Sequence, residues 1–223
     1  MKKLLMVVSG ADSLTLADGT SHPTGFWAEE VVESVRVLRA AGIEVTVATP
    51  GGVVPTVDKA SLDGTFDDAV ESLEDLRAPA VLESVQAADF DAIHLPGGHG
   101  PMADLASDEA LGALLADFHD SGKVVAALCH GPAGLLAAVR ADGSFVFAGK
   151  EMTAFSDEEE RQGGLNVPYS VAGRLAELGA RLTPGEPWSS TVVVDGTLVT
   201  GQNPQSTVAT ATRVAELLYP SST

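Results

Sequence analysis

The sequence of 223 residues contains little cysteine and few basic residues, and each shortage excludes a class of protein. A single cysteine cannot form an intrachain disulfide, so a reducing compartment such as the cytoplasm fits best. Thirteen Lys and Arg residues stand against 31 Asp and Glu residues, which gives a formal net charge of −18. Such a charge repels nucleic-acid phosphates and anionic membrane surfaces, so neither is expected as a partner.

Long apolar runs are also missing, and none approaches the ~20 residues that a membrane-spanning helix needs. The apolar stretch at residues 4–8 is too short for a signal peptide, and Asp12 soon interrupts it. The hydrophobic content of 45% nevertheless allows a substantial core. Because no repeat or low-complexity linker divides the chain, we expect a single domain over residues 1–223.

Strand-like apolar runs alternate with segments of helical periodicity. A strand is predicted at 3–9, a helix at 26–41 and a strand at 43–48, which together form a parallel crossover unit. Residues 10–24 and 51–64 are expected to be irregular, the second with room for a short hairpin. The other expected elements are acidic helices at 67–86, strands at 92–95, 123–128 and 150–155, helices at 108–119, 134–139 and 168–178, a hairpin at 191–200 and a closing helix at 204–218.

This order predicts an α/β fold in which helices cover both faces of an open, mostly parallel sheet. In such sheets, ligands bind outside the carboxyl ends of the strands. Three segments of unusual composition follow expected strands there, at residues 96–100, 129–131 and 156–160. We therefore expect the reactive residues of the protein to lie in these three segments.

Residues 124–132 read V-V-A-A-L-C-H-G-P, an apolar run that ends at the only cysteine, Cys129, with His130 next to it. A buried strand that delivers a thiol to a tight turn, with a helix behind it, is the geometry of a nucleophile elbow. The helix N-terminus and the neighbouring imidazole are expected to favour the reactive thiolate. The alternative is a structural cysteine, because free cysteine also packs as a small hydrophobe.

The segment 96–100, P-G-G-H-G, is rich in glycine. Its glycines allow backbone amides to approach a ligand closely, as an oxyanion site requires, although a plain turn is the alternative. It lacks the Gly-Lys-Ser/Thr ending of a phosphate loop and the G-x-G-x-x-G spacing of a dinucleotide site, so no nucleotide cofactor is expected.

The positions of the histidines restrict the possible mechanisms, because none lies beyond His130. This excludes the papain-like order, as well as a functional class I glutamine amidotransferase, since both need a later histidine. His130, or a carboxylate from another element, must assist Cys129. A metal site built from His94, His99, Cys129 and His130 matches no standard zinc spacing, so no metal is expected.

Two acidic segments offer carboxylates. Glu29 and Glu30 open the helix at 26–41, and adjacent helical positions point about 100° apart, so at most one faces the site. The alternative is that both only complement the helix N-terminus. The run Asp157 to Glu160 is equally compatible with a solvated surface.

Several of these segments together resemble the ThiJ/PfpI superfamily, which has the class I glutamine amidotransferase-like fold. They are A-I-H-L-P-G-G-H-G at 92–100, A-L-C-H-G-P-A-G-L at 127–135, V-D-G-T-L-V-T-G-Q-N-P-Q-S at 194–206, T-G-F-W-A-E-E at 24–30 and V-P-Y at 167–169. The Cys-His-Gly-Pro sequence is most similar to the glyoxalase III and heat-shock chaperone branch. The resemblance implies a flavodoxin-like three-layer sandwich, usually a homodimer.

The resemblance also implies roles for individual residues. Cys129 is the expected nucleophile, and Glu30 is the glutamate that faces it. An ungapped register pairs Glu160 with His130, whereas a gap of one residue selects Glu159. Gly98 and the backbone amide of His130 match the oxyanion donors of the family.

The implied activity is that of a glutathione-independent glyoxalase of the D-lactate dehydratase type, acting on methylglyoxal or a related 2-oxoaldehyde without a cofactor or metal. In this reaction the Cys129 thiolate adds to the aldehyde, and Glu30 moves a proton between the two carbons through an enediol. Because the superfamily hosts several chemistries, the alternatives are a protein deglycase, an amidase- or peptidase-like hydrolase, or a redox-responsive stress chaperone in which Cys129 is oxidised.

Overall fold

The computed structural model describes residues 1–220, at whose centre lies a seven-stranded sheet of order β10-β11-β7-β6-β1-β4-β5. All neighbouring strands are parallel except β10 and β11. The strands are β1 (Lys2–Val7), β4 (Ile43–Thr49), β5 (Ala80–Val81), β6 (Ala92–Leu95), β7 (Val124–Leu128), β10 (Val192–Asp195) and β11 (Leu198–Gly201).

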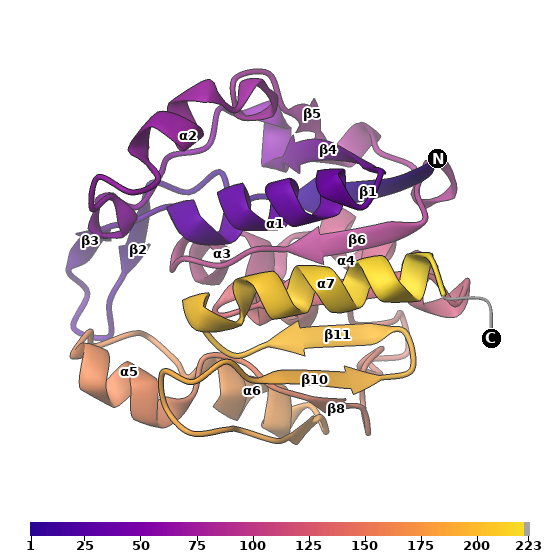
Figure 1. Cartoon of the computed structure of the whole chain (residues 1–223). Coiled ribbons are helices and arrows are strands. Elements are labelled where there is room, and N and C mark those ends of the chain that lie inside the picture. Colours follow the sequence, from indigo (N-terminus) through magenta and orange to yellow (C-terminus); the bar gives the residue numbers. More distant parts are fainter. Residues whose placement is uncertain (221–223) are drawn as a thin grey trace.

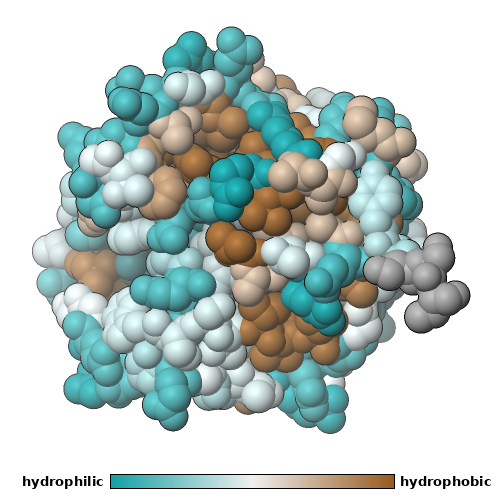
Figure 2. Space-filling model, viewed as in Figure 1, coloured by the Kyte–Doolittle hydropathy of each residue, from teal (hydrophilic) through white to brown (hydrophobic). Residues whose placement is uncertain are grey.

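Helices cover both faces of the sheet and give the molecule three layers (Figure 1). Helices α1 (Ala28–Ala40) and α7 (Thr207–Leu218) pack on one face, and α3 (Gly100–Ala103) and α4 (Glu109–Asp120) pack on the other. The expected flavodoxin-like sandwich with a mostly parallel sheet is confirmed. Figure 2 shows that apolar surface gathers near the middle of the face that carries α1 and α7. No described helix is long and apolar enough to span a membrane.

The central strands are apolar on both sides because each face of the sheet is covered. In β1, Leu4 and Met6 join the core beneath α1 and α7, whereas Leu5 and Val7 join the core beneath α4. Every residue of β7 is buried. This double coverage is why the strands appear in the sequence as continuous apolar runs.

The remaining elements are short. The helices are α2 (Asp67–Ser72), α5 (Asp157–Gly163) and α6 (Val171–Glu177), and the small sheets are β2 (Ser13–Thr15) with β3 (Ser21–Pro23) and β8 (Glu151–Met152) with β9 (Arg181–Leu182). Turns of 3-10 helix lie at Pro50–Gly52, Lys59–Ser61, Glu74–Leu76, Leu82–Ser84, Ala87–Asp89, Leu105–Ser107, Gly131–Ala137 and Pro204–Ser206.

The sequence expectations for the first irregular segments were wrong in two places. The acidic region 67–86 contains one short α-helix, two 3-10 turns and the edge strand β5 between these turns. Pro79, which lacks a backbone N–H, lies where a longer helix would have continued. The hairpin lies in the polar region 10–24 and not in 51–64. Its turn is closed by Asp18, which accepts hydrogen bonds from both the N–H and the hydroxyl of Thr20.

Two elements near Cys129 also differ from expectation. The predicted helix at 134–139 is a 3-10 turn at Gly131–Ala137, a conformation common in short, tight connections. The predicted strand at 150–155 forms only as β8, because the N–H of Thr153 donates to the side-chain oxygen of Thr200 instead of continuing a backbone ladder. The chain beyond β8 is therefore irregular as it approaches the site.

The parallel strands end together at one edge of the sheet. Leu95 of β6 pairs with Ala127 of β7, and Leu128 pairs with Gly201 of β11. The segments that follow β6, β7 and β11 therefore converge. The start of α1 and helix α5 lie at the same edge, on the left of Figure 1.

Candidate active site

Cys129 lies immediately beyond β7 in a tightly held turn. Its φ is +60°, a value that residues other than glycine seldom adopt. Its N–H donates to the carbonyl of Gly201 at 3.0 Å, and its own carbonyl accepts from the N–H of Phe155 at 2.9 Å. Strained backbone that is fixed on both sides is typical of functional sites, and here it directs the thiol away from the strand.

Glycines allow the ends of β6 and β7 to approach each other and α1. A Cβ on Gly131 would lie 2.1 Å from the carbonyl oxygen of Leu95. Gly98 has a φ of +89°, and a Cβ there would lie 2.3 Å from the carbonyl oxygen of Gly25. Side chains at either position would push apart the segments that form the site.

Glu30 contacts Cys129 from the first turn of α1 and is completely buried. Its Oε2 accepts a hydrogen bond from the N–H of Gly97 at 2.6 Å, while Oε1 has no partner among the described residues. Burial raises the pKa of Glu30 to about 8, against the hydrogen bonds from Gly97 and Cys129. The carboxyl is therefore mostly protonated at neutral pH. The neighbouring Glu29 is partly exposed, so the structure places Glu30 against the thiol.

His130 lies between the thiol and a second carboxylate. Its Nδ1 is 3.5 Å from the sulfur of Cys129, and its Nε2 is 2.7 Å from Oε2 of Glu160. Burial, aided by the nearby His99, lowers the pKa of His130 to about 4 although Glu160 opposes the shift. Because neutral imidazole carries one proton and the carboxylate can only accept, Nε2 is assigned as the donor and Nδ1 as the acceptor that faces Cys129.

Glu160 accepts hydrogen bonds from two histidines. Partial burial alone would raise its pKa, but the bonds from His130 and His99 outweigh burial and lower the pKa to about 2. Oε1 of Glu160 is 3.3 Å from Nε2 of His99. Glu160 is thus ionised at neutral pH, whereas Glu30 is not.

Glu159, the other candidate partner of His130, has a different function. Its Oε2 accepts bonds from the N–H and the hydroxyl of Ser156 in a capping box that starts α5. Its Oε1 accepts bonds from the N–H of Trp188 and the side-chain amide of Asn203, each at 2.8 Å. Glu159 therefore fixes helix α5, which in turn holds Glu160 against His130. This part of the acidic run is buried and not a solvated surface.

The surroundings of Cys129 favour the thiol and not the expected thiolate. Burial raises its pKa well above the usual range, and Glu30 adds to the shift, opposed by a backbone hydrogen bond from His130. The imidazole of His130 is neutral, and only a short 3-10 turn follows it. Both the burial and the neutral imidazole therefore favour a protonated thiol at Cys129.

Cys129, His130 and Glu160 line a cavity of about 170 Å³. Its remaining walls are largely apolar and include Phe155 and Trp188, whose rings meet edge to face with centroids 5.6 Å apart. Sequence reasoning missed both aromatic residues because they come from irregular segments far apart in the chain. The cavity suits a small molecule with a reactive polar end and an apolar remainder.

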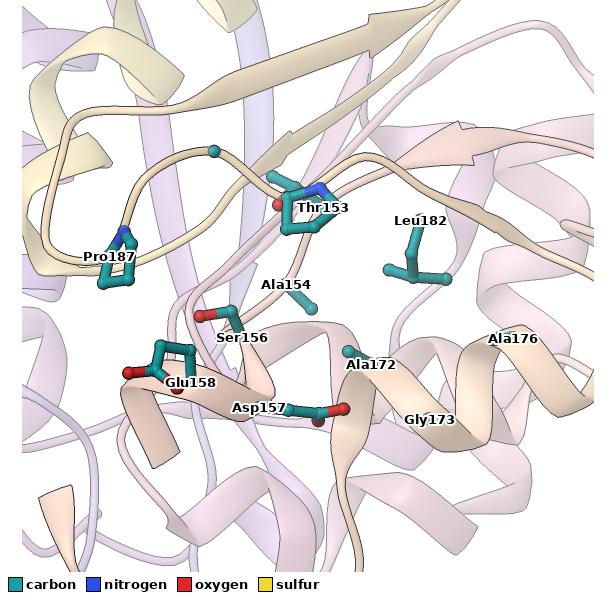
Figure 3. Close-up of a pocket in the computed structure, with 12 residues that line it drawn as sticks. Thr153, Ala154, Ser156, Asp157, Glu158, Ala172, Gly173, Ala176, Leu182 and Pro187 are labelled. Carbon is teal, nitrogen blue, oxygen red and sulfur yellow. The ribbon is translucent and has the colours of Figure 1, made fainter. Parts of the chain in front are cut away.

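A larger cavity of about 390 Å³ lies between the start of α5, helix α6 and the segment after Leu182 (Figure 3). Its two acidic residues already have partners, because Asp157 binds Ser170 and Glu158 binds Arg161. Neither Cys129 nor a histidine lines it. Although it is larger, this cavity has neither a thiol nor an imidazole in its walls, so the cavity at Cys129 is the candidate site.

The four residues that the sequence offered as metal ligands, His94, His99, Cys129 and His130, do not form one cluster, because His94 lies apart from the others. His94 is buried, and its Nε2 is 3.2 Å from the hydroxyl of Ser34 on α1. His99 instead lies beside His130, with ring centroids 4.1 Å apart. His99, His130 and Glu160 offer ligand atoms that lie within 4.8 Å of one another. The position of His99 directly after Gly98 was the signal in the sequence that placed it at the site.

Comparison with known proteins shows similarity over most of the chain. The DJ-1/PfpI family model matches residues 22–217. A Bos taurus protein named glutamine amidotransferase-like class 1 domain-containing protein 1 is 36% identical over 175 residues, which are 77% of this chain and 79% of the relative. A Pseudomonas aeruginosa protein named protein/nucleic acid deglycase HchA is 29% identical and covers 91% of this chain and 76% of the relative.

Glyoxalase 3 of Candida albicans is 29% identical over 234 residues, covering 95% of this chain and 96% of the relative. The crystal structure of glyoxalase III from the same organism matches with a TM-score of 0.79 and 28% identity, over 96% of this chain and 95% of that one. The names of these relatives describe different activities, whereas the fold and the sequence similarity are shared. The expected ThiJ/PfpI membership and its glyoxalase III branch are confirmed.

Proposed function

As this chain belongs to the DJ-1/PfpI family, we propose that it is a glutathione-independent glyoxalase that converts methylglyoxal or a related 2-oxoaldehyde into the 2-hydroxy acid. The observation that carries the proposal is the placement of two differently charged carboxyl groups beside one thiol. The protonated Glu30 contacts Cys129 from one side, and the ionised Glu160 reaches it from the other side through His130.

The first step is the addition of Cys129 to the aldehyde carbon. As the sulfur forms its bond to carbon, its proton passes to Nδ1 of His130, 3.5 Å away. The imidazolium that forms is stabilised by Glu160, as in triads of nucleophile, base and carboxylate. The N–H groups of Gly98 and His130 are the proposed donors to the hemithioacetal oxygen.

The second step moves hydrogen between the two carbons of the bound substrate. Ionised Glu30 removes the proton from the former aldehyde carbon, and the resulting enediol takes a proton back at the adjacent carbon. A pKa of about 8 suits this double role, because near neutral pH a minority of the group is ionised and can take up the proton, and the acid form can return it. The product is a thioester, and water releases the hydroxy acid and regenerates the thiol.

The reaction is an internal oxidation and reduction, so the overall change is the addition of one water molecule to the 2-oxoaldehyde. Its chemistry requires no external oxidant, and His130 and Glu30 take up the protons that leave the thiol and the former aldehyde carbon. The apolar walls at Phe155 and Trp188 offer a surface for the carbon substituent of the substrate. The homodimer implied by the family resemblance and the cytoplasmic location inferred from the single cysteine are part of the proposal. Light scattering of the purified protein tests the homodimer.

The direct test is incubation of the purified protein with methylglyoxal in the absence of glutathione, with D-lactate measured over time. We expect turnover by the wild type and a loss of at least about 1,000-fold for Cys129→Ala. Glu158→Gln is a matched control, because Glu158 is exposed on the same helix as Glu160 and binds Arg161. Absence of wild-type turnover, or full turnover by Cys129→Ala, would contradict the proposal.

A further inference from the structure

We propose that His99, His130 and Glu160 form a binding site for a divalent transition-metal ion, with Zn²⁺ as the representative, and that the bound ion stops the reaction of Cys129. The metal site follows from the arrangement of the three side chains alone. Its effect on turnover rests on the proposed function. The two parts are therefore tested separately.

The distances suit a small tetrahedral ion. Ligands at about 2.0–2.1 Å from zinc lie roughly 3.4 Å from one another. Nε2 of His99 and Oε1 of Glu160 are already 3.3 Å apart. Nε2 of His130 and Oε2 of Glu160 are 2.7 Å apart, so their hydrogen bond has to open by roughly 0.7 Å when an ion enters. These two distances involve different oxygens of Glu160, and the ligand atoms of all three residues lie within 4.8 Å of one another. The side chains therefore have to move by up to roughly 1.4 Å to place one oxygen and both nitrogens around an ion.

The surroundings also favour a cation. The side chains of His99, His130 and Glu160 are 17%, 2% and 14% exposed, so the ligands are sheltered and still reachable from the cavity. Three protein ligands leave a fourth position that opens toward the cavity, as in zinc sites that bind water or substrate. Two imidazoles and one carboxylate suit zinc, cobalt or nickel better than magnesium or calcium. The net charge of −18 attracts cations in general.

The ion would change which nitrogen of His130 carries the proton. Without metal, Nε2–H donates to Glu160, and Nδ1 is free to accept the thiol proton. A metal on Nε2 occupies the lone pair of that nitrogen, so the single proton of the neutral ring has to lie on Nδ1. Nδ1 then points a donor at Cys129 and can no longer accept its proton. A metal ion bound at Nε2 of His130 therefore prevents Nδ1, on the opposite side of the ring, from acting as the base for Cys129.

Cys129 itself is not part of the site. Its sulfur faces Nδ1, whereas the proposed ion binds Nε2 on the other side of the imidazole. A site made of Cys129 and His130 is the competing arrangement, and removal of the thiol distinguishes the two.

The binding experiment titrates untagged Cys129→Ala protein with Zn²⁺ against a chromophoric chelator, and titrates the protein with Cys129 intact with Co²⁺. We expect one ion per chain, no thiolate-to-cobalt charge-transfer band from the protein with Cys129 intact, and zinc affinity weakened by at least about 100-fold when His99→Asn is added to Cys129→Ala. His119→Asn is the control, because His119 lies on α4 and packs against Phe147. Thermal unfolding checks folding, and Zn²⁺ should raise the Tm of the parent more than that of the His99→Asn variant. Equal zinc affinity with and without His99, or loss of binding in the Cys129→Ala parent, overturns the site.

The activity experiment adds Zn²⁺ and then a chelator to the protein with Cys129 intact. Turnover should fall as the site fills and return when the metal is removed. His99→Asn, scaled to its own metal-free rate, should need at least about 100-fold more zinc. If zinc binds through His99 and turnover is unchanged, the proposed switch is wrong. If no turnover is seen under any condition, the proposed function fails, and the binding titration still decides whether the metal site exists.

Discussion

Helices α1 and α5 each carry consecutive glutamates in their first turn, and in each helix one of these glutamates reaches the Cys-His pair. Glu30 of α1 touches Cys129, and Glu160 of α5 touches His130. The two carboxyl groups belong to the same residue type and lie on opposite sides of a single Cys-His pair. Their pKa values are nevertheless about 8 and about 2.

The difference comes from the donors around each carboxyl group and not from burial alone, which raises the pKa of both. Glu30 receives bonds from one backbone N–H and from a thiol, and one of its oxygens has no partner among residues 1–220. Glu160 receives bonds from two imidazoles. Active sites often separate acid and base functions in this way, by giving two similar groups different environments.

In the proposed mechanism, Glu30 transfers the proton between the two carbons of the substrate. Its replacement should therefore have the largest effect on turnover of the substitutions considered in this comparison. Glu30→Gln keeps the size of the side chain and the bond from Gly97, but it can neither take up nor release a proton. We expect D-lactate formation to fall by at least about 1,000-fold, which is in the range of lost general acid-base catalysis. Activity within tenfold of the wild type would remove Glu30 from the mechanism.

The protonated state of Glu30 should also be visible in stability. Its pKa is about 8 in the folded protein and near 4.5 when exposed, so between these values the folded state holds a proton that the unfolded state has lost. Stability from Glu30 is therefore full below pH 4.5 and is lost as the pH rises toward 8. Relative to Glu30→Gln, the wild type should lose about 1.4 kcal/mol of unfolding free energy per pH unit between pH 5 and 8. Urea unfolding across this range measures it, and parallel curves would mean that Glu30 is ionised.

Glu160→Gln tests the other carboxyl group. An amide at this position can still accept a bond from Nε2 of His130 but cannot stabilise the imidazolium that forms when Cys129 reacts. We expect kcat/KM to fall by roughly 100-fold, less than for Glu30→Gln, because the neutral His130 and the oxyanion donors are retained. Steady-state kinetics near pH 7 measure the loss. A larger loss than for Glu30→Gln would reverse the ranking of the two residues.

The same two regions show what the sequence could predict. Cys129 next to His130 was visible because chain neighbours after a strand have to meet at a turn. The positions of Glu30 and Glu160 came from the family resemblance, because the periodicity of α1 and the run of four acids gave no unique choice. The direction of the pKa shift of the thiol differs from the expectation, because it depends on burial beside Glu30, which is 99 residues away in the chain.

The cavity walls and the second histidine show a further limit. Phe155 and Trp188 reach the site from segments without regular structure, so no periodicity marked them. The capping function of Glu159 depends on Trp188 and Asn203, which approach it only in the folded chain. Features built from strand ends were therefore predictable, whereas features built from loop-to-loop contacts were not.

The smallest predicted effect concerns Glu29, the neighbour that does not reach the thiol. Burial is the main reason for the raised pKa of Glu30, and the negative charge of Glu29 adds to it. Glu29→Gln should therefore lower the pKa of Glu30. Because kcat/KM rises with pH as Glu30 ionises, this rise should move to lower pH by about 0.1 to 0.7 of a unit, which is equivalent to ~0.2–1 kcal/mol. Glu33→Gln is the control, because Glu33 is paired with Arg36 on the same helix and is not among the causes of the Glu30 shift. A shift to higher pH, or an equal shift in both variants, would show that the pH dependence belongs to a group other than Glu30.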